Sequence, residues 1–171
     1  METEEQVKEA TTEVVEATKL ERANRSVKNY VLGSMAVGVI PVPMVDLAVL
    51  TGVQLKMLHS LSNIYEIEFS KNMGKSILAA LLGGFVPAST SMTAASLTKS
   101  VPIIGQTTGI VSMVMLAGAS TYAVGKVFIQ HFESGGTFLN FDPESVRAYF
   151  AEEFKKGQEV ISKIKPNKSE S

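Results

Sequence analysis

Few side chains in this sequence have the chemistry of an active site. The most suggestive pair is Asp46 and Gln54, eight residues apart on a predicted helix and therefore on one face. If that face is buried among helices or in lipid, Asp46 is a costly ionisable group and a candidate functional residue. An acid in the first turn of a helix also stabilises it by facing exposed N–H groups, and we favour this structural interpretation of Asp46.

The other groups that could support catalysis are missing or badly spaced. There is no cysteine, and the two histidines, His59 and His131, have no third metal ligand at a suitable spacing. Residues 74–76 read Gly-Lys-Ser but lack the leading glycine of a phosphate-binding loop, and no G-x-S-x-G turn occurs. We therefore expect no enzyme activity, no metal and no cofactor. We interpret His131 as a cap or a surface residue near a helix end.

Composition narrows the class of protein further. The chain has 171 residues and a formal net charge of −1, so it is long enough for one domain with a real core. Without a basic field we expect no nucleic-acid partner. The sequence starts with glutamates and no apolar leader follows, so we expect no cleaved signal peptide and a cytoplasmic N-terminus.

The stretch from Ser76 to Gly125 organises the rest of the chain. Lys99 is its only charged residue, and lysines flank it on both sides, at Lys71, Lys75 and Lys126. Each uncharged segment is long enough to cross a bilayer as a helix, but the many Gly, Ala, Ser and Thr residues make its hydropathy borderline. Small residues equally suit helices packed closely in a bundle. The hairpin could thus span the bilayer, dip into it or form a core; if it spans, the lysines favour cytoplasmic termini.

Hydrophobic periodicity predicts an all-α fold, a bundle of about five to six helices with the apolar, Gly/Ala-rich hairpin at its centre. The expected helices cover residues 2–21, 30–39, 43–69, 76–97 (kinked or ended at Pro87), 103–132, and a last helix with Asp142 as its N-cap. We divide the chain into an acidic amphipathic helix at 1–24, an apolar domain at 25–141, an amphipathic helix at 142–165 and a disordered tail at 166–171.

Prolines and glycines mark the expected turns. Pro41 and Pro43 interrupt one helix and open the next, and Pro102 sits in a similar apolar turn. The glycine pair at 135–136 should stop the helix before it. We expect residues 137–141 to form a short apolar loop that packs back onto the bundle.

Several of these segments together resemble a known family. The residues concerned are Val39 to Asp46 with Gln54, Met57, Ile64 and Tyr65, then Val101 to Gly105, Thr121 to Lys126, and His131 to Thr137. They resemble the YcjF-type family, domain of unknown function 697, over about Arg25 to Phe141. Glu66 stands where many members are expected to carry glycine. The candidate functional residues are Pro41, Pro43, Asp46, Gln54, Pro102, Gly105, Thr121, Gly125, Gly135 and Gly136.

The resemblance implies a bacterial, membrane-associated helical module that often occurs fused or adjacent to P-loop GTPases, and it supplies no catalytic residues. Our leading hypothesis is a non-enzymatic membrane-associated protein that forms homo-oligomers through small-residue faces, contacts membrane lipid and serves as adaptor for a cytoplasmic partner such as a P-loop GTPase. Two alternatives are a soluble all-α interaction domain and a small channel or transporter component, in which Asp46 and Gln54 would line a wet path.

Overall fold

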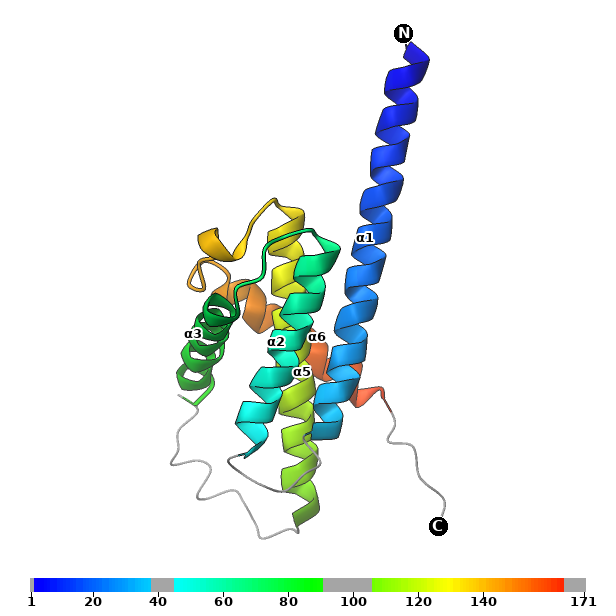
Figure 1. Cartoon of the computed structure of the whole chain (residues 1–171). Coiled ribbons are helices and arrows are strands. Elements are labelled where there is room, and N and C mark those ends of the chain that lie inside the picture. Colours follow the sequence, from blue (N-terminus) through cyan, green and yellow to red (C-terminus); the bar gives the residue numbers. More distant parts are fainter. Residues whose placement is uncertain (1, 38–44, 91–105, 165–171) are drawn as a thin grey trace.

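A computed structural model describes residues 2–37, 45–90 and 106–164 of the chain. These residues form five α-helices and one short 3-10 helix and contain no β-strand (Figure 1). The elements in chain order are α1 (Glu2–Val37), α2 (Val45–Ile64), α3 (Lys71–Thr90), α5 (Gln106–Glu133), η1 (Phe138–Asn140) and α6 (Arg147–Ser162). The prediction of an all-α helical bundle is confirmed.

Helix α5 lies at the centre of the bundle. It packs most extensively against α6 and α1 and also contacts α2, which in turn packs against α1. Within the described residues both arms of the predicted apolar hairpin are helical, but α3 packs mainly against α2, α6 and η1. In Figure 1, α1, α2 and α5 run alongside one another and α6 crosses them.

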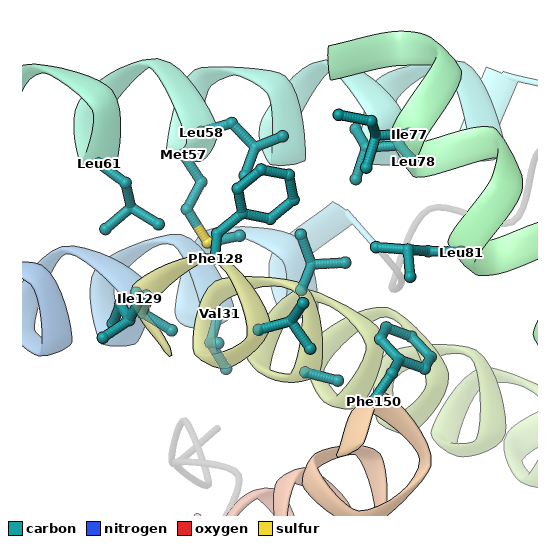
Figure 2. Packing of buried hydrophobic residues seen from close by; sticks show 14 of the residues in the cluster. Val31, Met57, Leu58, Leu61, Ile77, Leu78, Leu81, Phe128, Ile129 and Phe150 are labelled. Atoms are coloured by element: carbon teal, nitrogen blue, oxygen red, sulfur yellow. The ribbon is translucent and has the colours of Figure 1, made fainter. Parts of the chain in front are cut away.

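The core forms where these helices meet. Phe128 of α5 and Met57 and Leu58 of α2 have no solvent exposure, and Phe150 of α6 is almost as deeply buried. Figure 2 shows Phe128 pointing towards the α2 side chains and Phe150 entering the same cluster from α6. Burial of large apolar side chains of this kind is the main stabilising contribution to such a bundle.

Helix α1 is one continuous helix, which corrects the prediction of separate helices at 2–21 and 30–39. Residues 22–29 carry Arg22, Arg25 and Lys28, and we had placed these cations between the two helices. They lie inside α1 because none of them breaks a helix, and Ala23 and Val27 beside them are buried in the core. The N-terminal half of α1 extends past the other helices (Figure 1).

The end of α2 and the start of α3 also differ from the prediction. Helix α2 ends at Ile64 rather than near Phe69, because Glu66 adopts a left-handed φ of 59° and the Ile67 N–H donates to the Ser62 carbonyl at 2.8 Å. Helix α3 begins at Lys71, inside the expected connector at 70–75, where the Ser70 hydroxyl accepts from the Met73 N–H at 3.4 Å. It continues past Pro87 to Thr90, so it does not end at that proline.

The start of α6 is a further correction. We had placed Asp142 as the N-cap, but the helix begins at Arg147 with Val146 as its N-cap. The Asp142 carboxylate instead accepts from the Glu144 N–H at 3.1 Å, and the Ser145 hydroxyl donates to the Asp142 carbonyl at 2.9 Å. These bonds hold a turn ahead of the helix, as Asp commonly does.

Among the helices in the described part of the chain, none is both long and apolar enough to cross a membrane.

Candidate functional site

Gln54 lies at the centre of a polar cluster inside the bundle. Its side chain has no solvent exposure, and its Nε2 lies 3.4 Å from Ser120 Oγ and 3.3 Å from Thr121 Oγ1 on α5. Two of the candidate residues, Gln54 and Thr121, are thus brought together although 67 positions separate them. Both distances are at the long end for hydrogen bonds, so each bond is weak.

A third helix adds to the same cluster. Ser34 of α1 is fully buried, and its hydroxyl donates to the carbonyls of Val31 at 2.8 Å and Ala117 at 3.3 Å. The Ser120 hydroxyl donates to the same Ala117 carbonyl at 3.1 Å. Sequence reasoning missed both serines. The sequence pattern that could have indicated them is a serine on an otherwise apolar helix. This pattern also occurs at many positions that have no functional role.

One atom of the cluster lacks a hydrogen-bond partner among the described residues, namely Gln54 Oε1. A buried amide oxygen left without a donor costs about 1–3 kcal/mol. If the Gln54 amide were flipped, Oε1 would face the two hydroxyls. Both N–H groups of the amide would then need hydrogen-bond acceptors. The hydroxyls and the amide do not titrate near neutral pH, so this cluster can orient helices or bind a small polar group but cannot transfer protons as an acid or base.

The structure does not place the predicted prolines, Gly105 or the Asp46 side chain relative to this cluster. Pro41, Pro43, Pro102 and Gly105 lie outside the described residues. Asp46 is the second residue of α2, as the first-turn prediction required. In the described part of the chain no group of three or more His, Asp or Glu side chains is placed to hold a metal ion.

Gly125 allows α1 and α5 to approach closely. A Cβ at this position would come within 2.6 Å of a methyl group of Val27. At Gly118 a Cβ would come within 2.5 Å of Ile161 Cδ1, so α6 approaches α5 in a similar way. At these two positions the small residues of α5, which we expected to mediate self-association, pack against α1 and α6 of the same chain.

Gly135 and Gly136 end α5, as predicted. Gly135 has a φ of 78°, and the N–H groups of Gly135 and Gly136 donate to the carbonyls of Phe132 and His131, each at 2.9 Å. This is the Schellman pattern of a helix C-terminus. His131 Nε2 lies 2.9 Å from the Thr137 carbonyl oxygen, which ties the following loop to the helix.

The loop after Gly136 packs back onto the bundle, which confirms that prediction. Phe138 is 3% exposed, and the Phe141 ring stacks on Phe128 with 4.7 Å between centroids. Nearby, the Tyr65 hydroxyl donates to a Glu133 carboxylate oxygen at 2.5 Å. Burial, and next the bond to Glu133, raise the pKa of Tyr65 well above its ordinary value. The C-terminal ends of α2 and α5 are thereby joined.

A groove of about 430 Å³ lies between α1, α5 and the end of α6. Lys28 and Leu32 of α1 line it, and Leu32 is 44% exposed. Across from them, Lys126 of α5 donates to Asn24 Oδ1 at 2.6 Å, and its Nζ lies 5.6 Å from the Tyr122 ring centre. The groove thus combines apolar walls with two cations, and sequence periodicity alone did not indicate it.

Comparisons with known proteins found one matching family and one related protein of known name. The model of a family described as "Domain of unknown function (DUF697)" matches residues 3–159. Magnetosome membrane protein 22 of Magnetospirillum gryphiswaldense is 40% identical over 147 residues, which cover 85% of this chain and 75% of that protein. No solved structure matches the chain significantly. The family match extends on both sides beyond residues 25–141 and includes most of α1 and α6.

Proposed function

The chain belongs to the DUF697 family, and from this premise we propose that it is a non-enzymatic, membrane-associated helical protein that self-associates and serves as an adaptor for a cytoplasmic partner. One observation carries the membrane part of the proposal: a protein 40% identical over 85% of this chain is named a magnetosome membrane protein. Identity at this level over nearly the whole chain supports a similar location in the cell.

Two features support the adaptor role: the chemistry of the buried polar cluster and the exposed apolar residues on the surface. The buried polar cluster of Ser34, Gln54, Ser120 and Thr121 has no group that titrates near neutral pH, so its chemistry is that of helix positioning. The surface, by contrast, has the projecting half of α1 and the groove beside it, both with exposed apolar residues. Exposed apolar surface of this kind is typical of interaction sites.

The partner that the family resemblance favours is a P-loop GTPase, with both termini of this chain on the cytoplasmic side. Copurification of a GTPase with the tagged full chain, dependent on the bound nucleotide, would support this partner. Tags at both termini should resist protease in intact spheroplasts and become accessible after lysis. A terminus cleaved before lysis would contradict the proposed orientation.

The decisive experiment is fractionation of cells that express the full chain. We expect the protein in the membrane pellet, and we would compare its release by high salt, by carbonate and by detergent. Release only by detergent would indicate integral association, and release by salt or carbonate a peripheral one. Recovery in the supernatant, together with a tagged soluble control protein, would overturn the membrane proposal.

One observation favours the second candidate, an all-α interaction domain that does not contact the bilayer. Gly118 and Gly125 of α5 face Ile161 and Val27, so the small-residue face is used to pack the chain's own helices. The same fractionation decides between the two candidates. We do not propose a channel, since Gln54 has no solvent exposure and so does not line a wet path.

A further inference from the structure

The projecting half of α1 carries apolar side chains that no other described helix covers. Val14, Val15 and Leu20 are 64%, 46% and 38% exposed. The helix extends past α2 and α5 along this half (Figure 1). Most of the stability of a helix in a protein comes from the packing of an apolar face rather than from helix propensity. Packing of a partner along the N-terminal half of α1 would therefore stabilise it.

The apolar strip of the projecting half, Val14 and Ala17, lies on the face of α1 that borders the groove, whereas Val15 lies about 100° from Val14 around the helix. Val14 and Leu32 are 18 residues apart, which is five full turns of an α-helix, so their side chains point in the same direction. Leu32 lines the groove, and Val160 of α6 across from it is 41% exposed. This face of α1 thus leads from Val14 in the projecting half, past Glu21 and Lys28, to an apolar groove between α1, α5 and α6.

Charge divides α1 into two complementary halves. Residues 2–16 contain the glutamates Glu2, Glu4, Glu5, Glu9, Glu13 and Glu16 and one cation, Lys8. Residues 19–28 contain the cations Lys19, Arg22, Arg25 and Lys28 and one acid, Glu21. Lys28 and Lys126 both line the groove. The groove therefore suits an acidic helix with an apolar strip, and the first half of α1 is such a helix.

We propose that two copies of this chain pair their α1 helices antiparallel, each laying the acidic half of its α1 into the groove of the other. The inference deepens the self-association in the proposed function and rests on it, but not on membrane binding. An antiparallel pair places opposite charges together and keeps the two bundles at opposite ends. A parallel pair would align two acidic halves and is disfavoured by like-charge repulsion.

The periodicity of α1 and the position of the groove together fix the register of the pair. Val14, Glu21 and Lys28 repeat every seven residues, and so do Ala17 and Asn24, on the neighbouring line of the same face. In an antiparallel pair of helices the two lines face each other, and registers that differ by seven residues all satisfy this. The register that lays residues 6–14 of one copy along the groove positions 24–32 of the other puts Val14 beside Asn24, with the two-fold axis at the level of Lys19.

Mass measurement on the purified full chain in solution tests the dimer. We expect a dimer that dissociates as salt is raised, because the attraction is between exposed charges. Val14→Glu should weaken dimerisation at least about tenfold, and so should Lys28→Glu. The matched control is Leu139→Glu, which alters an apolar residue that is 84% exposed on η1 and should leave the mass unchanged. Circular dichroism would check that each variant still folds.

Cysteine cross-linking tests the orientation directly, because the natural chain has no cysteine. A mixture of Val14→Cys and Asn24→Cys chains should form a disulfide between the two variants under mild oxidation. Val14→Cys alone should cross-link poorly. A disulfide within the Val14→Cys sample would indicate parallel helices and overturn the proposal.

The other outcomes also separate this inference from the proposed function. A wild-type chain that stays monomeric at all concentrations overturns the α1 pairing, whatever the fractionation shows. If that monomer binds vesicles of anionic lipid and loses the binding with Val14→Glu, the strip contacts lipid instead of a second copy. A dimer recovered only in the supernatant of the cell fractionation would support this inference and contradict the membrane proposal.

Discussion

Val27 of α1 fills the space that a side chain at position 125 of α5 would need. Two methyl carbons of Val27 lie 2.6 and 2.7 Å from where a Cβ at Gly125 would stand. Both residues are buried, so neither can move into solvent to relieve the overlap. The contact between α1 and α5 therefore depends on the absence of a side chain at Gly125.

Gly125→Ala should destabilise the protein by about 1–3 kcal/mol, because overpacking of a filled core forces the helices apart. The free energy of unfolding from urea denaturation measures this. Adding Val27→Ala to Gly125→Ala should recover part of the loss, so the two changes would be non-additive. Gly33→Ala is the matched control on α1, since nothing lies within 4 Å of a Cβ there, and it should be neutral or stabilising. Additive losses at positions 27 and 125 would contradict the packing described.

The unpartnered amide oxygen of Gln54 leads to a second prediction. Gln54→Leu removes the orphan acceptor and keeps most of the volume, while the Ser120 hydroxyl still donates to Ala117. We expect the free energy of unfolding of this variant to fall by no more than about 1 kcal/mol or to increase. Gln54→Ala should instead cost about 2–4 kcal/mol, since it leaves a cavity. Chemical denaturation of both variants measures the difference. A loss as large for leucine as for alanine would mean that Oε1 has a partner, such as an ordered water.

Glu66 leads to a third prediction because it occupies a left-handed conformation with a φ of 59°. Replacement by glycine removes the clash between Cβ and the backbone, so Glu66→Gly should stabilise the protein by about 0.5–1 kcal/mol. The change also removes the exposed ion pair with Lys19 at 3.5 Å, which contributes little. Glu66→Gln is the control, because it removes the charge and keeps the strained backbone. Thermal unfolding that shows the two variants to be equally stable would mean that the backbone is not strained.

Sequence reasoning succeeded where a local pattern determines the structure. Gly135 and Gly136 end α5 because only the chain within five residues is involved. It failed where a local signal competed with packing. Asp142 was a strong N-cap candidate, yet its carboxylate holds a turn and the helix starts at Arg147. Glu66 gave no sign of a helix end by residue type, and only the family resemblance indicated glycine at that position.

In the candidate site, too, individual residues were predicted from the sequence but the contacts between distant segments were not. Gln54 and Thr121 were selected separately, from motifs, and nothing in the sequence indicated that they meet 67 positions apart. The two serines of the cluster, Ser34 and Ser120, were missed because a buried serine on an apolar helix has no distinctive spacing. The lysine-lined groove depends on how α1, α5 and α6 cross, which periodicity along one helix does not determine.

Tyr65 makes stability depend on alkaline pH. Its pKa is raised above the ordinary value of 10.0, first by burial and then by its hydrogen bond to Glu133. A pKa that is higher in the folded chain means that folding favours the neutral phenol. The resulting stability is fully present below pH 10 and is lost as the pH rises through the raised pKa.

We therefore expect the stability advantage of the wild type over Tyr65→Phe to shrink as the pH is raised above 10. Burial also raises the pKa of Tyr122 and Tyr149, so both proteins lose stability in this range and only the difference between them isolates Tyr65. Urea denaturation at pH values on both sides of 10 measures it. A difference that stays constant through this range would mean that the Tyr65 phenol ionises equally easily in the folded and unfolded chains, and that the bond to Glu133 does not hold the ends of α2 and α5 together in solution.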